Sequence, residues 1–168
     1  MAIVKQRSLS WWEKLYLGPI LGGLALTFRK LFAKKITRQY PEERLDPSPA
    51  FHGHPVLVKN DDGSPQCVAC GLCEFVCPPR AITIQPGETD RSIEREPKTF
   101  EIDMLRCIYC GYCEEVCPEE AIVMSQHYEL TGHSRAELIF GLDKLLVPRA
   151  QLMDRIEHIR KVYDRWKD

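Results

Sequence analysis

The sequence contains no cysteine outside residues 67–117, although that segment holds all eight of them. It also lacks a secretory signal: the first apolar run begins at Leu9, no small-residue cleavage site follows, and a basic segment lies downstream. We therefore expect a reducing compartment, where thiols serve metals more often than disulfides. The composition, with 28% charged and 44% hydrophobic residues, excludes a disordered or collagen-like chain.

The chain also lacks an uncharged run long enough to span a bilayer. Residues 15–28 form 14 positions without a charge, whereas a spanning helix needs about 20. Aromatic residues lie near the start of this run and basic residues follow it, namely Trp11, Trp12, Tyr16, Arg29, Lys30, Lys34 and Lys35. The pattern is typical of an amphipathic helix in the headgroup plane, or of a helix packed on a partner protein. We expect residues 9–38 to contact a membrane surface, a partner, or both.

Charge is unevenly distributed along the chain. Residues 1–40 carry eight basic side chains and one acidic side chain, a net charge of +7. Because the whole chain carries −1, the remaining 128 residues carry −8. A basic, apolar head on an acidic body indicates that the two parts face different surroundings.

The sequence divides into four segments. Residues 1–38 form the amphipathic arm, 39–60 a Pro-rich connector, 61–126 the cysteine-bearing domain, and 127–168 a helical tail. In the tail, Ser134 to Glu137 fits a capping box that predicts a helix ending before Pro148. A second helix is predicted beyond Pro148, from apolar residues three and four positions apart: Leu152, Ile156, Ile159, Tyr163 and Trp166.

The cysteine-bearing domain contains an internal repeat. Residues 67–84 align with residues 107–124, and ten of the 18 positions are identical. Each copy is preceded and followed by a short β-prone segment: 56–58 and 81–84 for the first, 100–102 and 121–124 for the second. Two copies of strand, ligand loop, short helix and strand predict an α+β, pseudo-twofold unit. Neither copy can bury much apolar surface alone, so we expect each to need the other copy and its metal in order to fold.

Each copy carries the spacing C-x2-C-x2-C-x3-C-P. Three thiolates at intervals of three lie on one tight loop that wraps a cubane, with backbone N–H groups directed at its sulfurs. The two runs predict two [4Fe–4S] clusters. A disulfide framework and zinc are the alternatives. Three cysteines at this spacing, twice, in a chain with no visible signal disfavour the first, and zinc leaves the third cysteine of each run unexplained. The candidate metal ligands are Cys67, Cys70, Cys73, Cys77, Cys107, Cys110, Cys113 and Cys117.

The run is similar to that of two-cluster ferredoxins, in which the fourth cysteine ligates the other cluster. This resemblance implies a ferredoxin-like domain with crossed ligands. The first cluster would be held by Cys67, Cys70, Cys73 and Cys117, and the second by Cys107, Cys110, Cys113 and Cys77.

The other polar residues near the cysteine runs give less specific functional signals. Arg80 and Arg106 either raise a cluster potential or are solvated surface charges. Since eight cysteines already satisfy two cubanes, the nearby histidines are interpreted as surface or partner contacts: His52, His54, His127 and His133.

From about Gly22 to Leu146 the chain resembles the two-cluster ferredoxin-like subunit of respiratory complex I, the NADH:quinone oxidoreductase. The motifs that carry the resemblance are GGLALTFRKLFAKKITRQYPEE, RCIYCGYCEEVCPEEAI, and HYEL followed by RAELIFGLDKLL. The resemblance implies an electron-transfer subunit that relays electrons from upstream clusters towards the terminal cluster and quinone. It implies a part in an oxidoreductase and translocase, with no complete NADH, flavin or quinone site on this chain.

The same resemblance implies a hetero-oligomer, peripheral on the cytoplasmic face of the bacterial inner membrane. Its partners would be an upstream iron–sulfur subunit, the terminal-cluster subunit, the quinone-site subunit and membrane subunits, with no nucleic acid. Two alternatives stay open: a diffusing ferredoxin, and a subunit of a related membrane hydrogenase or ferredoxin-accepting relative. The chain departs from the family at His52-Gly53, where Arg-Gly is common. Residues after Pro148 lie outside the resemblance, and we expect them to dock on a neighbouring subunit.

Overall fold

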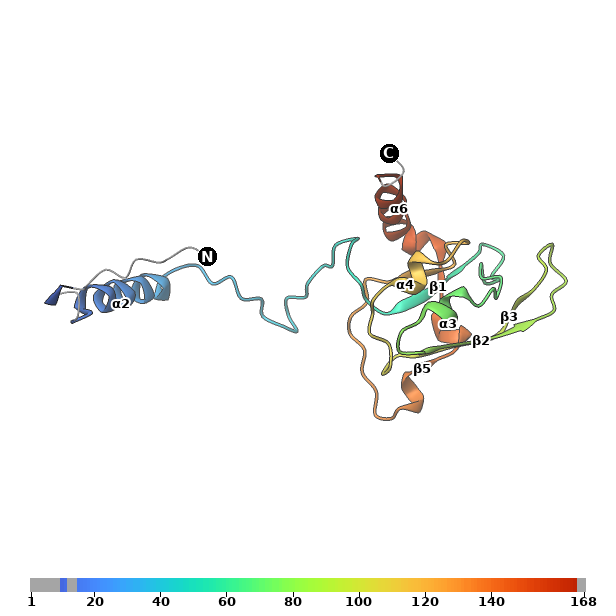
Figure 1. The fold of residues 1–168 in the computed structure, drawn as a ribbon, viewed down its shortest axis with the longest axis horizontal. Coiled ribbons are helices and arrows are strands. Elements are labelled where there is room, and N and C mark those ends of the chain that lie inside the picture. Colours follow the sequence, from blue (N-terminus) through green and yellow to red (C-terminus); the bar gives the residue numbers. More distant parts are fainter. Residues whose placement is uncertain (1–9, 12–14, 166–168) are drawn as a thin grey trace. The chain divides into compact units, whose positions relative to one another are not determined.

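The computed structural model describes residues 10–11 and 15–165, and the chain forms two compact units, residues 1–45 and 46–168 (Figure 1). Trp12 and Trp166, which were part of the predicted arm and tail, lie outside the described residues.

The first unit contains helix α2, Leu17–Leu31. Pro19 lies in the first turn, where a missing N–H breaks no helical hydrogen bond, and the helix continues through Gly22 and Gly23. None of the α2 residues is buried within this structure. Its large exposed apolar side chains include Leu21, Leu24, Phe28 and Leu31. Across residues 10–11 and 15–165, no helix has both the length and the apolar character needed to cross a membrane.

The second unit contains two three-stranded sheets, with strand orders β4-β1-β6 and β2-β3-β5. The strands are β1 (Pro55–Lys59), β2 (Ile82–Gly87), β3 (Glu96–Asp103), β4 (Ile122–Met124), β5 (Ile139–Phe140) and β6 (Leu146–Pro148). The helices are α3 (Leu72–Val76), α4 (Tyr112–Glu115), the 3₁₀ turn η1 (Ala136–Leu138), α5 (Leu142–Leu145) and α6 (Arg149–Arg165).

The strands that flank the cysteine runs are exchanged between the two repeats. β1 precedes the first run and pairs antiparallel with β4, which follows the second, so that Leu57 lies opposite Ile122. β2 follows the first run and pairs antiparallel with β3, which precedes the second, so that Ile82 lies opposite Ile102. The four predicted strands are therefore confirmed, and each sheet joins both repeats.

Strand β1 is buried on both faces, which explains its unbroken apolar sequence. Val56 and Val58 pack with Leu152 and Ile156 of α6 on one face. Leu57 faces the other way, because successive side chains of a strand point to opposite sides. It lies in the core cluster that includes Cys67, Cys73, Phe100, Ile102 and Ile122.

The tail differs from the prediction in its first part. The helix predicted from Ser134 to Pro148 is wrong: that segment holds η1, β5, α5 and β6 instead. Glu137 does accept hydrogen bonds from the His133 amide and the Ser134 hydroxyl, but these close only one short turn. The apolar residues that follow add one strand to each sheet, β5 beside β3 and β6 beside β1. The second predicted helix is confirmed as α6, with Leu152 and Ile156 buried.

Candidate iron–sulfur site

The two cysteine loops have the same local backbone. Ala69 and Gly71 have positive φ angles of 50° and 79°, and forty residues later Tyr109 and Gly111 have φ angles of 55° and 84°. Left-handed residues turn the chain sharply, and glycine adopts this conformation without strain. The turns curl each loop before α3 and α4 begin, which is the local geometry that the spacing predicted.

The fourth cysteine of each run also has equivalent surroundings in the two copies. Ala81 donates its amide hydrogen to the Cys77 sulfur at 3.2 Å, and Ala121 donates to the Cys117 sulfur at 3.3 Å. Amide donors of this kind favour a negatively charged sulfur.

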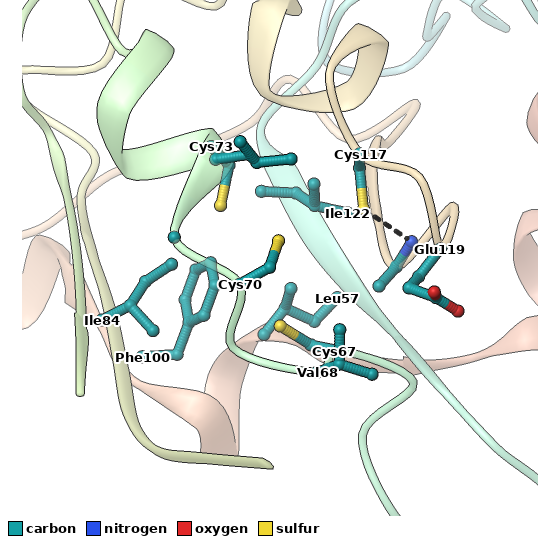
Figure 2. A pocket seen from close by; sticks show the side chains of 13 residues that line it. Leu57, Cys67, Val68, Cys70, Cys73, Ile84, Phe100, Cys117, Glu119 and Ile122 are labelled. Atoms are coloured by element: carbon teal, nitrogen blue, oxygen red, sulfur yellow. Dashed lines mark hydrogen bonds between the residues drawn. The ribbon is translucent and has the colours of Figure 1, made fainter. Parts of the chain in front are cut away.

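Three cysteines of the first run and one of the second surround a common pocket. Figure 2 shows the sulfur atoms of Cys67, Cys70, Cys73 and Cys117 directed towards this space. The remaining wall is mostly apolar and includes Leu57, Ile84, Phe100 and Ile122.

The surroundings of this pocket favour the neutral, protonated form of its buried thiols. Burial raises the pKa of Cys67 to about 11 and that of Cys73 to about 12, and the neighbouring thiols Cys117 and Cys70 add to both shifts. Four thiolates so close in an apolar pocket repel one another and are poorly solvated. A cationic iron–sulfur core supplies the missing compensation, so the donor set fits such a group.

The remaining cysteines gather on the side of the second run. Burial raises the pKa of Cys107, and the charges of Cys77 and Cys110 act in the same direction. Burial also raises the pKa of Cys113, with added contributions from Cys73 and Cys107. Cys77 from the first run thus neighbours Cys107, just as Cys117 neighbours Cys67. Within the described part of the chain, no three Cys, His, Asp or Glu side chains converge tightly enough to hold a single metal ion.

Comparison with known proteins identifies the family. Residues 66–121 match the family described as the 4Fe-4S dicluster domain. The chain is 56% identical to NADH-quinone oxidoreductase subunit 9 of Rhodothermus marinus, over all of this chain and 71% of that protein. It is 46% identical to NADH-quinone oxidoreductase subunit I 1 of Geobacter sulfurreducens, over 76% of this chain and 96% of that protein.

The chain belongs to the subunit I family of NADH-quinone oxidoreductase. The resemblance seen in its motifs is therefore confirmed. Among solved structures, a chain of the archaeal membrane-bound sulfane sulfur reductase aligns over 81% of this chain and 62% of its own length, with 28% identity and a TM-score of 0.49. That likeness is too weak to add to the family assignment.

In this subunit I family member, the arginines and histidines named from the sequence lie outside the thiol pocket. Arg80 and Arg106 are both exposed. His54 is half-buried and stacks on exposed His127 with ring centroids 5.8 Å apart, and burial lowers the pKa of His54. His52 is exposed, and its Nδ1 lies 3.3 Å from the carbonyl oxygen of Tyr109. His133 is exposed as well.

One buried charged pair beside the cysteines is absent from the residues predicted from the sequence. Glu114, the residue after Cys113, forms an ion pair with Arg155 of α6. Two signals were available: a glutamate follows the third cysteine of both runs, as Glu74 and Glu114, and Arg155 falls on the apolar stripe that includes Leu152. A charged residue on the apolar face of a helix needs a buried partner.

Proposed function

We propose that this chain relays electrons between other redox centres of a membrane-bound NADH:quinone oxidoreductase, through two [4Fe–4S] clusters, towards the terminal cluster and quinone. The observation that carries the proposal is the pocket shared by Cys67, Cys70, Cys73 and Cys117. When bound, each cluster takes up and gives back one electron at a time. The relatives are named as subunits of NADH-quinone oxidoreductase. The proposal extends membership of such a complex to this chain.

In this proposal the ligands are crossed. Cys117 completes the first set, and Cys77 completes the second set of Cys107, Cys110 and Cys113. The chain's own residues then have three tasks. The thiolates hold iron, the apolar wall around Leu57 and Phe100 keeps water away, and loop amides such as that of Ala121 stabilise negative sulfur.

The crossed set agrees with a pseudo-twofold relation between the repeats, which we also propose. Support comes from the repeated left-handed residues, the equivalent sulfur contacts of Cys77 and Cys117, and the exchanged strands. Crossed ligation would keep the two clusters close enough for rapid electron transfer, because each repeat would supply one cysteine ligand to the cluster of the other repeat.

We assign the outlying segments to docking. Residues 1–38 would be the amphipathic arm, with 9–38 against the membrane surface or a membrane subunit, since α2 exposes apolar side chains and carries Arg29 and Lys30 in its last turn. Residues 39–60 would be the connector, 61–126 the two-cluster domain, and 127–168 the tail, which would contact a neighbouring subunit.

The proposal places the chain on the cytoplasmic face of the membrane, inside a hetero-oligomer. Its partners are an upstream iron–sulfur subunit, the terminal-cluster subunit, the quinone-site subunit and membrane subunits. The chain contributes to a translocase without a complete active site of its own, so its substrate is the electron.

The test replaces one ligand of each run in the intact membrane complex. Cys70→Ser should remove one [4Fe–4S] electron paramagnetic resonance (EPR) signal, and Cys110→Ser should remove a different one. In both variants NADH should still reduce clusters upstream of this subunit, while NADH:quinone reduction is lost. If both variants keep full quinone reduction, the chain is not in the electron path.

A further inference from the structure

The tail helix reaches the second cysteine run through a buried ion pair. Arg155 of α6 donates from Nε to Glu114 Oε1 at 3.0 Å and from Nη2 to Glu114 Oε2 at 2.5 Å. The two side chains are only 6% and 5% exposed. This two-pronged geometry is the strongest way for an arginine to hold a carboxylate.

The pair is completed by two backbone groups. Glu114 Oε1 also accepts the amide hydrogen of Met124, the last residue of β4, at 2.7 Å. Arg155 Nη1 donates to the carbonyl oxygen of Pro49 at 2.8 Å. A buried ion pair adds little net stability by itself, because desolvation of two charges offsets their attraction. Its location therefore calls for another role.

That location is next to a proposed cluster ligand. Glu114 directly follows Cys113 and lies on α4, which packs against α3 and β4. The Glu114 carboxylate is buried, so little water screens its charge from the cluster that the adjacent Cys113 is proposed to ligate.

The equivalent glutamate of the first run is not held in this way. Glu74 follows Cys73 as Glu114 follows Cys113, but Glu74 is only half-buried. Within residues 10–11 and 15–165, Glu74 has no ion-pair partner. Helix α6 packs over β1 and β4, and its Arg155 pairs with the glutamate of the second run. The ion pair therefore makes the two otherwise similar halves electrostatically different.

Two further contacts hold α6 beside the cysteine runs. Arg160 binds the Glu120 carboxylate, three residues after Cys117, and Arg149 Nη1 donates to Gln66 Oε1 at 2.9 Å, one residue before Cys67. The helix is thus attached on both sides of Arg155, which restricts how far that side chain can move.

We propose that Arg155 is a positioning residue for the second [4Fe–4S] cluster: it holds Glu114, and with it Cys113, in place, and its positive charge cancels a carboxylate that would otherwise lower that cluster's reduction potential. The proposal rests on the proposed ligand set. It gives the tail a task within this chain, beyond any contact with a neighbouring subunit.

The sign of each effect follows from charge. Reduction adds an electron, so a nearby uncompensated carboxylate disfavours it and an uncompensated guanidinium favours it. Arg155→Met should therefore shift the potential of the second cluster to a more negative value, and Glu114→Gln should shift it to a more positive value. The double variant Glu114→Gln/Arg155→Met should return close to the unmodified potential.

The experiment is a redox titration of the full complex, followed by the EPR signal that Cys107→Ser abolishes. Glu74→Gln is the matched control and should leave that signal's potential unchanged. Opposite shifts in the two single variants, cancelled in the double variant, support the proposal, because loss of packing alone cannot produce opposite signs. Unchanged potentials in all three variants with both clusters present would overturn it.

A variant that loses the second cluster is still informative. If Arg155→Met loses iron and the double variant regains it, an uncompensated buried carboxylate is the cause, as proposed. If the double variant loses iron equally, Arg155 serves only packing and the proposal is wrong. A failure of the proposed function looks different, since the unmodified complex would then show no pair of [4Fe–4S] signals dependent on Cys70 and Cys110.

Discussion

The amide of Gly53 donates a hydrogen bond to the carbonyl oxygen of Ser125 at 2.8 Å, and a Cβ on this glycine would lie 2.6 Å from the same oxygen. The carbonyl oxygen of His127 would be in conflict as well. Both obstacles are backbone atoms, which cannot rotate away as side chains do. The close approach joins the chain just before β1 to the chain just after β4, so it secures the pairing between the repeats.

Replacement of this glycine should be severely destabilising. We expect Gly53→Ala to cost about 3 kcal/mol or more, because the two segments must separate. Gly63→Ala is the control: Gly63 has a φ of +87° but open surroundings, so only backbone strain of about 1–2 kcal/mol is added. Apparent melting temperatures of the cluster-loaded chains test this. If the melting temperature falls equally in the two variants, the backbone around Gly53 accommodates the added Cβ without a large cost.

Crossed ligation predicts which signal each cysteine affects. Cys117→Ser should perturb the EPR signal that depends on Cys67, although Cys117 belongs to the other run, and Cys77→Ser should perturb the signal that depends on Cys107. EPR spectra of the four single variants provide the comparison. Should Cys117→Ser and Cys107→Ser damage one and the same signal, the ligands are not crossed.

Removal of the clusters should reveal the raised thiol pKa values. Only the thiolate attacks an alkylating agent, so buried Cys67 and Cys73, with pKa values of about 11 and 12, should react slowly at pH 8. Because deprotonation rises with pH up to each pKa, their rates should keep increasing from pH 8 to pH 10. Mass spectrometry of the gently chelated chain measures this.

The matching control is the same chain in urea, where burial is lost and both thiols should react faster at pH 8. With clusters bound, all eight cysteines should be protected, and the chain should contain about eight iron atoms and no zinc. A content of four irons with one run open to alkylation would contradict two clusters.

Helix α6 should contribute substantially to the stability of the domain. Ile156 is 1% exposed and packs against Val56 and Val58, so Ile156→Ala should cost about 2–5 kcal/mol. Phe75 is 91% exposed, and Phe75→Ala should change stability by less than about 0.5 kcal/mol. Thermal unfolding of the loaded chain distinguishes the two. A small loss for Ile156→Ala would show that α6 is only loosely attached.

The basic end of the arm should govern attachment to anionic membranes. One basic residue near such a surface contributes about 1 kcal/mol, so replacing Arg29, Lys30, Lys34 and Lys35 by Gln should weaken binding to phosphatidylserine vesicles many-fold. High salt should mimic the change. Lys98→Gln, outside the arm, is the control. Unaltered vesicle binding of the fourfold variant would favour a protein partner for the arm instead.

The sequence predicted the parts of the fold that have strong local signals. The cysteine spacing located both loops, and the apolar run at Val56–Val58 located β1 correctly. The prediction for the segment after Ser134 is wrong because its capping residues signal a helix, whereas Ile139 and Leu146 belong to strands of two or three residues whose partners are distant in sequence. Strands this short leave no periodicity to read.

The candidate site was predictable to a similar degree. The eight cysteines followed from spacing alone, but the Glu114–Arg155 pair did not, because Glu114 and Glu74 occupy equivalent places in the repeat. Only the fold shows that α6 covers one of them and leaves the other half-exposed. Asymmetry of this kind depends on contacts between segments forty residues apart, which a local pattern cannot encode.

The exchanged strands also bear on the origin of the repeat. Because β1 pairs with β4 and β2 pairs with β3, the strand pairs that flank the runs join one repeat to the other. Two separate, identical single-repeat chains would form the same pairs across a two-fold axis, as a symmetric dimer does. A gene duplication that fused two such chains would change no partner of these strands. It would only convert contacts between ancestral subunits into contacts within one polypeptide, which leaves each half free to diverge afterwards.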